Sequence, residues 1–319
     1  MKNYDVTALG ELLIDFTENG ESSQGNPLFE ANPGGAPCNV LAMLSKLGHK
    51  TAFIGKVGND FFGEQLKRAI TEVGIDSGYL LKDDEVHTTL ALVHTYPDGD
   101  RDFSFYRDPG ADMMLTENEI SEVVIKDSRI FHFGTLSMTH EGVRAATKKA
   151  VRFAREAGAL ISFDPNLRPP LWKSMNEARE QILYGLEECH ILKISDNEIQ
   201  WLTGKTDYTE GVEWINERYR IPLILVSMGK QGSRAYYNGR MVEAAPFLQE
   251  NTIETTGAGD TFCGCVLHYI CENGLEDLSD EDLKQMLTFA NAAASLVTTR
   301  KGALRVMPEE EEILELLKK

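Results

Sequence analysis

The stretch Thr255-Thr256-Gly257-Ala258-Gly259-Asp260 is followed directly by TFCGCVLHYI, an apolar run suited to a buried helix. Its glycines allow the backbone to approach a ligand closely, and a helix that starts just beyond them directs free N–H groups at an anion. Such a turn can hold a phosphate group without a charged side chain. We therefore expect an anion-binding turn at Gly257, Ala258 and Gly259.

Asp260 closes this turn, and two interpretations of it are open. Aspartate is a common capping residue at the start of a helix. A carboxylate beside a transferred phosphoryl group would instead orient the acceptor hydroxyl and accept its proton. The local sequence does not decide between a cap and a catalytic base.

Upstream of this turn, strand-like apolar runs alternate with segments of helical period. The strand-like runs lie near 4–9, 51–57, 130–134, 159–164, 190–194 and 222–227. The helical segments lie near 37–48, 62–73, 141–157, 176–188 and 209–219. This alternation predicts an α/β fold with a mostly parallel sheet, helices on both faces and ligands beyond the carboxyl ends of the strands.

One segment breaks the alternation and predicts a small second sheet. The residues from Thr88 to Arg107 read as two strands joined by the turn Pro97-Asp98-Gly99-Asp100. Together with the residues from Leu13 to Pro33 they would form a β-sheet lid, with its strands inserted at about 13–33 and 87–112. We expect a single domain over 1–319 that carries this lid.

Charge excludes two classes of partner. The chain has 50 acidic and 32 basic residues and a net charge of −18, which repels nucleic acid and anionic membrane surfaces. The sequence shows no apolar run of about 18 residues and no export signal, so we expect a cytoplasmic protein. A phosphate ligand must then be met by local backbone dipoles and a few cations.

The five cysteines stand at 38, 189, 263, 265 and 271. Their odd number and unpaired spacing predict no disulfide framework. Cys263 and Cys265 fall on different faces of a helix, so we expect no metal site there.

Longer motifs carry a family resemblance. GGAPCNV at 34–40 with GKVGNDFFG at 55–63 resembles the first signature of the PfkB (ribokinase-like) carbohydrate kinases, and TTGAGDTFCG at 255–264 resembles the second. Further segments fall where the family has them: DPNLR at 164–168, KISDNE at 193–198, SMGKQGS at 227–233 and FANAAASLVTTRKGA at 289–303. The resemblance covers essentially the whole chain. It implies a three-layer α/β/α fold with a small β-sheet lid.

The resemblance also implies an activity, the transfer of the γ-phosphoryl group of ATP to a sugar hydroxyl. It makes Asp260 the catalytic base and the amides of Gly257, Ala258 and Gly259 the anion hole. The positions that match sugar-contacting residues of the family are Asp15, Gly34, Gly35 and Asn39.

On the nucleotide side, the resemblance implies a set of ATP-binding residues and a magnesium ion. The ATP-binding positions are Lys193, Ser195, Ser227, Gly229, Gly232, Asn291 and Ser295. Glu198 would hold the magnesium ion through water. Two departures stand out: Ser195 replaces the usual asparagine, and Glu254 replaces an aspartate that many members use near a potassium ion. Potassium dependence therefore stays open.

The acceptor is inferred from the lid. RDFSFYRDPGADMML at 101–115 resembles the lid segment of fructokinase members, in which Arg107 would lean toward the sugar. Arg168 would lie near the acceptor or the transferred phosphate, because its planar donor suits oxygen-rich groups. The expected reaction converts D-fructose to fructose 6-phosphate. The alternatives are 2-keto-3-deoxygluconate or ribose as acceptor, and a sugar- or nucleotide-binding sensor without turnover. We also expect a homodimer formed through the lid.

Overall fold

The computed structural model describes residues 2–95 and 101–318, without the side chains at 94, 95 and 101–103. Its main sheet contains ten strands in the order β14-β13-β12-β11-β10-β9-β1-β4-β5, with β6 paired to β4. The strands are β1 (Tyr4–Leu9), β4 (Thr51–Gly58), β5 (Ile75–Asp76), β6 (Leu80–Asp83), β9 (Ser128–Gly134), β10 (Leu160–Asp164), β11 (Ile191–Ser195), β12 (Leu223–Ser227), β13 (Ser233–Tyr237) and β14 (Arg240–Ala244).

The core of this sheet is parallel. β1 pairs with β4 on one side and with β9 on the other, and β9, β10, β11 and β12 continue in the same direction. The antiparallel pairs of the described sheet are β12 with β13 and β13 with β14, at one edge. The predicted mostly parallel sheet is confirmed. The strand order reverses at β1, and in open parallel sheets ligands bind beyond the strand ends at such a reversal.

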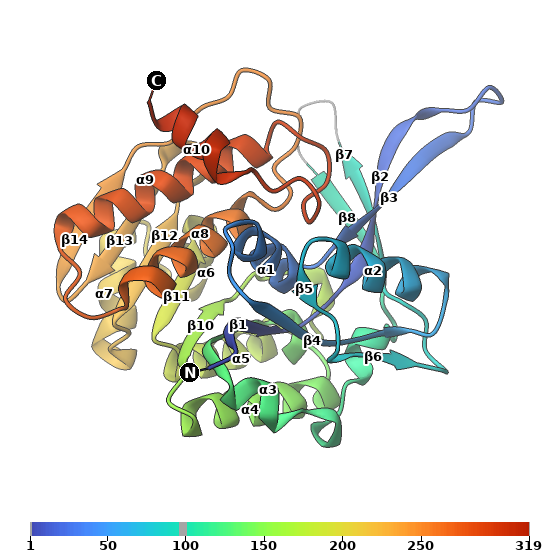
Figure 1. Ribbon diagram of the computed structural model, residues 1–319, viewed down its shortest axis with the longest axis horizontal. Coiled ribbons are helices and arrows are strands. Elements are labelled where there is room, and N and C mark those ends of the chain that lie inside the picture. Colours follow the sequence, from blue (N-terminus) through green and yellow to red (C-terminus); the bar gives the residue numbers. More distant parts are fainter. Residues whose placement is uncertain (1, 96–100, 319) are drawn as a thin grey trace.

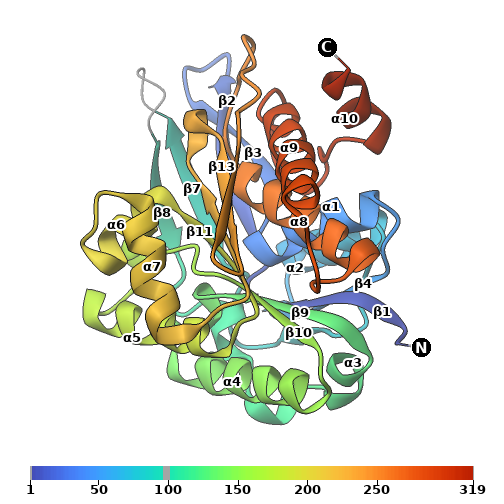
Figure 2. The same ribbon diagram turned by 90° about the vertical axis from the view of Figure 1, so that its left-hand side faces the viewer.

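Helices cover both faces of the sheet, as Figure 2 shows for α8 and α9 on one side and α6 and α7 on the other. The first face carries α1 (Ala36–Lys46), α2 (Phe61–Glu72), α8 (Ala258–Asn273), α9 (Asp280–Val297) and α10 (Glu310–Leu317). The second face carries α3 (Glu122–Lys126), α4 (Glu141–Glu156), α5 (Met175–Glu188), α6 (Asp196–Thr203) and α7 (Tyr208–Tyr219). Short 3₁₀ turns lie at Ala111–Met114, Glu117–Glu119, Leu136–Met138, Pro169–Leu171 and Gly229–Gln231.

The sequence of β1 explains why both faces are covered. Successive side chains of a strand point to opposite faces, and Val6 and Ala8 join the core beneath α1 and α8. Leu9 joins the core on the other face. A strand that is apolar on both sides is stable only between two layers of helices, which gives the three-layer arrangement.

A second sheet of four strands projects from this body in the order β3-β2-β7-β8 (Figure 1). Its strands are β2 (Leu13–Glu21), β3 (Pro27–Gly34), β7 (Leu90–Thr95) and β8 (Arg101–Tyr106). β2 pairs antiparallel with β3 and parallel with β7, and β7 pairs antiparallel with β8. The predicted turn at 97–100 lies outside the described residues. We call this sheet the lid.

Candidate active site

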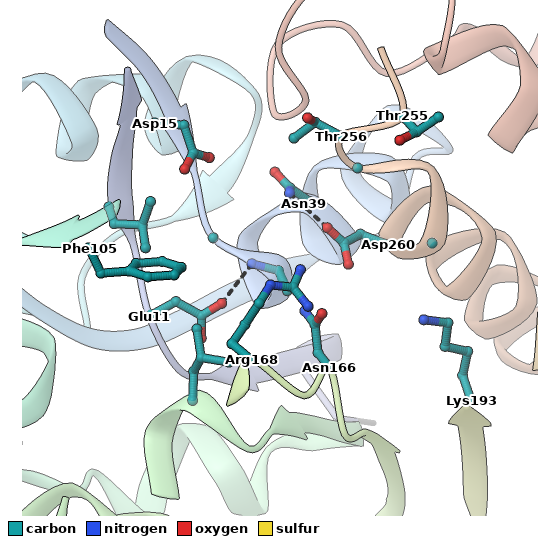
Figure 3. Close-up of a pocket in the computed structure, with 16 residues that line it drawn as sticks. Glu11, Asp15, Asn39, Phe105, Asn166, Arg168, Lys193, Thr255, Thr256 and Asp260 are labelled. Atoms are coloured by element: carbon teal, nitrogen blue, oxygen red, sulfur yellow. Dashed lines mark hydrogen bonds between the residues drawn. The ribbon is translucent and has the colours of Figure 1, made fainter. Parts of the chain in front are cut away.

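Two pockets open near the carboxyl ends of the parallel strands. The first, the acidic pocket, has a volume of about 400 Å³ and is shown in Figure 3. It is lined by Glu11, Leu13, Asp15, Gly35, Ala36, Asn39, Phe105, Leu136, Asn166, Arg168, Lys193, Thr255, Thr256, Gly257, Gly259 and Asp260. The lining comes from the ends of β1, β10 and β11, from the lid and from the start of α8. Residues scattered over the sequence thus meet at one place.

The second, the apolar pocket, has a volume of about 540 Å³. Its lining is Ser227, Gly229, Lys230, Gly232, Pro246, Phe247, Leu248, Gln249, Thr252, Thr255, Ala258, Gly259, Phe262, Asn291, Ala294, Ser295 and Thr298. Thr255 and Gly259 line both pockets. The turn at the start of α8 therefore forms the common wall between an acidic and an apolar pocket.

This turn has the backbone conformation expected of an anion site. Gly257 precedes α8 in the left-handed region, with φ 77° and ψ −5°, and no side chain caps the helix there. A methyl group at Gly257 would approach Cβ of Ala303 to 2.7 Å, so both the conformation and the space favour glycine. The first N–H groups of a helix without a side-chain cap can bind an anion, although here the amide of Ala258 donates a 3.2 Å hydrogen bond to the carbonyl of Thr255.

Asp260 lies in the first turn of α8 and is half-buried at the acidic pocket. Nδ2 of Asn39 donates a hydrogen bond of 2.8 Å to Oδ2 of Asp260, which Figure 3 draws as a dashed line. Burial raises the pKa of Asp260 to about 6, the hydrogen bond from Asn39 opposes this rise, and the nearby Asp164 adds to it. Asp260 does not cap α8, and its half-buried carboxylate is oriented by Asn39, as a catalytic base requires.

Two more carboxyl groups face the acidic pocket, those of the buried Glu11 and the half-buried Asp15. Burial raises the pKa of Asp15 to about 7, and Asp260 adds to the rise while Arg168 opposes it. Burial also raises the pKa of Glu11 to about 7, although Oε1 of Glu11 accepts a 2.8 Å hydrogen bond from the amide of Ala36 at the start of α1. A group of carboxyl oxygens in so small a space suits a ligand with several hydroxyl donors.

Glycines beside Asp15 make this arrangement possible. A methyl group at Gly34 would lie 2.2 Å from Oδ2 of Asp15, and one at Gly35 would lie 2.4 Å from the carbonyl oxygen of Glu11. Gly35 has φ 132°, which few other residues adopt, and it precedes α1 directly. Of the two predicted sugar-contacting glycines, Gly35 lines the pocket, and Gly34 leaves room for the Asp15 carboxylate.

Two cations balance these acids. Nζ of Lys193 lies 2.9 Å from Oδ2 of Asp164, both side chains are buried, and the Lys193 amino group lies next to Gly259. Burial alone would lower the pKa of Lys193, but Asp164 and Glu198 outweigh it and raise the pKa. Arg168 extends into the acidic pocket in Figure 3. Lys193, which the sequence assigns to ATP binding, therefore lines the acidic pocket and not the apolar pocket.

The apolar pocket collects five of the residues that the sequence assigns to ATP: Ser227, Gly229, Gly232, Asn291 and Ser295. The side chain of Asn291 is held in place, since Oδ1 accepts a bond from Ser233 and Nδ2 donates to the carbonyl of Ala245 at 3.0 Å. Gly232 has φ 93°, and a methyl group there would lie 2.2 Å from the carbonyl oxygen of Ala244. The loop after β12 thus has room only for glycine at this point.

The predicted orientation of Arg107 is wrong. Its guanidinium group is buried and donates to Oδ2 of Asp112 from Nε at 2.8 Å and from Nη2 at 2.6 Å. Further bonds go to Thr139 and to the carbonyl of Leu136, a residue of the pocket wall. The buried Asp112 carboxylate is a stronger partner than a solvated pocket, so Arg107 supports the wall from behind while Phe105 lines the pocket.

Ser195 and Glu198 lie outside both pocket linings and form the capping box of α6. Oε2 of Glu198 accepts bonds from the amide and hydroxyl of Ser195, each 2.9 Å, and Oε1 accepts one from the amide of Leu167 at 2.7 Å. Glu254 is similarly engaged, because Oε1 accepts a 2.6 Å bond from the amide of Gly302. These three residues have structural roles in the chain as it stands.

Glu11 is the acidic residue of the pocket that sequence reasoning missed. It stands two residues beyond β1, in the same GELLID segment as Asp15. The sequence did contain a signal for Glu11, which is a charged residue within an apolar stretch at the end of a central strand. An acidic side chain at such a position is seldom buried unless it has a partner.

A family model matches nearly the whole chain. The model of the pfkB family carbohydrate kinases matches residues 3–310. The chain belongs to this family. The match spans both pockets and the lid, so the resemblance of the sequence motifs to PfkB kinases is confirmed.

Curated relatives of this pfkB family kinase match over nearly its full length. Fructokinase-1 of Zea mays is 41% identical over 316 residues, which cover 98% of each chain. Fructokinase-1 of Oryza sativa subsp. japonica is 40% identical over 314 residues, covering 98% of this chain and 97% of the relative.

Solved structures show the same fold. A fructokinase with bound ATP from Xylella fastidiosa has a TM-score of 0.90 at 29% identity and covers 100% of this chain and 99% of its own. A fructokinase from Vibrio cholerae O395 with bound fructose, ADP and calcium ion has a TM-score of 0.87 at 27% identity, covering 98% and 99%. The ribokinase-like fold is therefore confirmed. Among the described residues, no helix combines the length and apolar character that crossing a membrane requires.

Proposed function

We propose that this kinase transfers the γ-phosphoryl group of ATP to the 6-hydroxyl of D-fructose. The observation that carries the proposal is the common wall: the uncapped start of α8 separates a pocket lined by three carboxyl groups from an apolar pocket. A sugar suits the first pocket and a nucleotide base the second, and the helix start lies between them, where the γ-phosphate would be transferred. The fructokinase relatives support fructose as the acceptor.

In this mechanism Asp15, Gly35 and Asn39 hold the sugar, and Asp260 accepts the proton of its 6-hydroxyl group. The hydroxyl oxygen forms a bond to the γ-phosphorus of ATP as the bond to the β,γ-bridging oxygen breaks, and ADP leaves. Negative charge that develops on the transferred group is met by the amides of Gly257, Ala258 and Gly259. Closure of the lid would keep water from competing with the sugar.

The apolar pocket would take the adenosine part of ATP, with Asn291 and Ser295 beside the base and Ser227, Gly229 and Gly232 toward the ribose and phosphates. Magnesium would arrive bound to the phosphate oxygens and keep several waters. Glu198 would reach it only through water, because both of its oxygens already accept hydrogen bonds. A potassium ion near Glu254 would share this side chain with the amide of Gly302, which donates to Oε1.

The acidity of Asp260 predicts a pH profile. Because its pKa is raised to about 6, Asp260 loses its proton at a higher pH than an ordinary aspartate. As a base it must be deprotonated, so kcat/KM for the sugar should fall as the pH is lowered through about 6 to 7, where Asp15 also titrates. In the Asp15→Asn variant, the fall in kcat/KM near pH 6 should remain. A profile that stays level down to pH ~4, the ordinary pKa of aspartate, would contradict the assignment.

The acceptor is tested by measuring ADP release from Mg-ATP with fructose, ribose, glucose, mannose, 2-keto-3-deoxygluconate and fructose 6-phosphate. We expect fructose to give the highest kcat/KM, and phosphate NMR of the product identifies the 6-position. Faster turnover with ribose or 2-keto-3-deoxygluconate would identify that sugar as the acceptor and leave the proposed phosphoryl transfer unchanged. Absence of turnover with every sugar, together with measurable sugar or ATP binding, would favour a sensor.

A homodimer through the lid and a cytoplasmic location are also proposed. The lid strands expose large apolar side chains, with Leu28 47% and Tyr106 62% exposed. A second lid would cover them and the open strand edges. Light scattering of the wild type and of Leu28→Lys tests this: a monomeric wild type would exclude the dimer.

A further inference from the structure

Outside the active site, three potential metal ligands meet between α1, β4 and α8. His49 lies between α1 and β4, while His268 and Glu272 stand one helical turn apart in the second half of α8. One ligand atom from each residue lies within 4.8 Å of the other two. The cluster combines a buried, a half-buried and an exposed side chain, so an ion from solution can enter it.

The distances suit a small ion with four ligands. Nε2 of His49 lies 2.7 Å from Nδ1 of His268 and 3.9 Å from Oε1 of Glu272. A tetrahedral zinc ion with bonds of about 2.0 to 2.1 Å holds neighbouring ligand atoms about 3.3 Å apart. On binding zinc, the distance from Nε2 of His49 to Nδ1 of His268 must therefore increase by about 0.6 Å, and the distance from Nε2 of His49 to Oε1 of Glu272 must decrease by about 0.6 Å. Small side-chain rotations suffice for both changes.

The second nitrogen of His49 has the partner that metal-bound histidines usually have. Nδ1 of His49 lies 3.5 Å from Oδ2 of Asp5, and the His49 side chain is only 6% exposed. In metal sites a carboxylate at this nitrogen orients the ring and leaves the other nitrogen free to bind the ion. The Asp5–His49 pair thus directs Nε2 toward His268 and Glu272.

We propose that His49, His268 and Glu272 form a binding site for a divalent transition metal ion of the zinc class, with water as the fourth ligand. Two imidazoles and one carboxylate select zinc, nickel or copper over magnesium, which requires oxygen ligands. The ion would therefore be distinct from the magnesium that accompanies ATP.

Such an ion would join the loop that follows α1 to the second half of α8. These helices already pack closely, since a methyl group at Gly264 would meet Cβ of Met43 at 2.8 Å. Their opposite ends carry Asn39 and Asp260, which are joined by a hydrogen bond in the acidic pocket. The site lies at the other end of the same helix pair, so its effect is on stability and not on the chemical step.

The experiment titrates zinc into tag-free protein in the absence of nucleotide, by calorimetry and by thermal unfolding. The wild type should bind one equivalent and unfold at a higher temperature with zinc. Cobalt(II) should give the strong visible absorption of a tetrahedral ion. Asp5→Asn should bind zinc about 10- to 100-fold more weakly, because metal affinity falls by this factor when a residue that orients a metal-binding side chain is lost.

Two ligand variants and one control complete the test. His268→Asn and Glu272→Gln should each no longer bind the one equivalent of zinc. Because the Glu272 side chain is 61% exposed, Glu272→Gln should fold normally, and its loss of zinc binding could not be attributed to misfolding. His87→Gln is the control, because the His87 side chain is 91% exposed and lies outside the cluster. The proposal is overturned if the wild type binds no zinc, if Glu272→Gln binds it as tightly as the wild type, or if His87→Gln loses binding as well.

Discussion

Asp260→Asn is expected to lower kcat for sugar phosphorylation by about 10²- to 10⁴-fold, the range that a positioned general base contributes. Asparagine keeps the size of the side chain and an oxygen that accepts the hydrogen bond from Asn39. It cannot accept the proton of the sugar hydroxyl. Binding of sugar and ATP, measured by calorimetry, should therefore stay within a few-fold of the wild type while turnover falls.

Asn39→Ala separates positioning from proton transfer. It removes the hydrogen bond to Asp260 but leaves the carboxylate in place, so its loss in kcat should be smaller than that of Asp260→Asn. If Asp260→Asn instead retained wild-type kcat, Asp260 would be no more than a residue of the first helical turn, and the base would have to be sought elsewhere in the acidic pocket.

Gly257→Ala is expected to lower kcat by about 10²- to 10³-fold, the effect of losing one donor at a developing charge. The added methyl group would lie 2.7 Å from Cβ of Ala303, and alanine disfavours the φ of 77°. The start of α8 must then shift, and with it the amides that would face the transferred phosphoryl group. Steady-state kinetics should show the loss mainly in kcat.

Gly204→Ala is a matched control for this variant. Gly204 ends α6 with φ 71° and ψ 9°, close to the values of Gly257, and a methyl group there meets no atom within 4 Å. Both variants carry the same backbone penalty of about 1–2 kcal/mol, measurable by denaturant unfolding. Only Gly257→Ala should lose activity. Equal activity in the two variants would mean that the start of α8 does not hold the reacting phosphate.

Periodicity in the sequence predicted the main elements well. The runs near 51–57 and 222–227 are β4 (Thr51–Gly58) and β12 (Leu223–Ser227), and the segment 209–219 is α7 (Tyr208–Tyr219). Long amphipathic or doubly apolar segments carry their own pattern, because one side or both sides must be buried. The antiparallel edge formed by β13 and β14 was not foreseen, since short strands at a sheet edge show little pattern of their own.

Side-chain orientation was harder to predict than side-chain location. Arg107 was expected in the pocket, but Asp112, only five residues away, binds it in the interior. Which of two acceptors an arginine chooses depends on how deeply each is buried, and the sequence does not specify that depth. Glu11 was missed for the same reason, because its role depends on the amide of Ala36, 25 residues further along the chain.

The turn at the start of α8 contributes Thr255 and Gly259 to the walls of both pockets. Whatever occupies one pocket and moves this turn also reshapes the other, so the two substrates are energetically linked. Linkage of binding free energies is reciprocal: the factor by which the sugar changes the affinity for ATP equals the factor by which ATP changes the affinity for the sugar. In a kinase whose two pockets share one wall, binding of either substrate thus changes the affinity for the other.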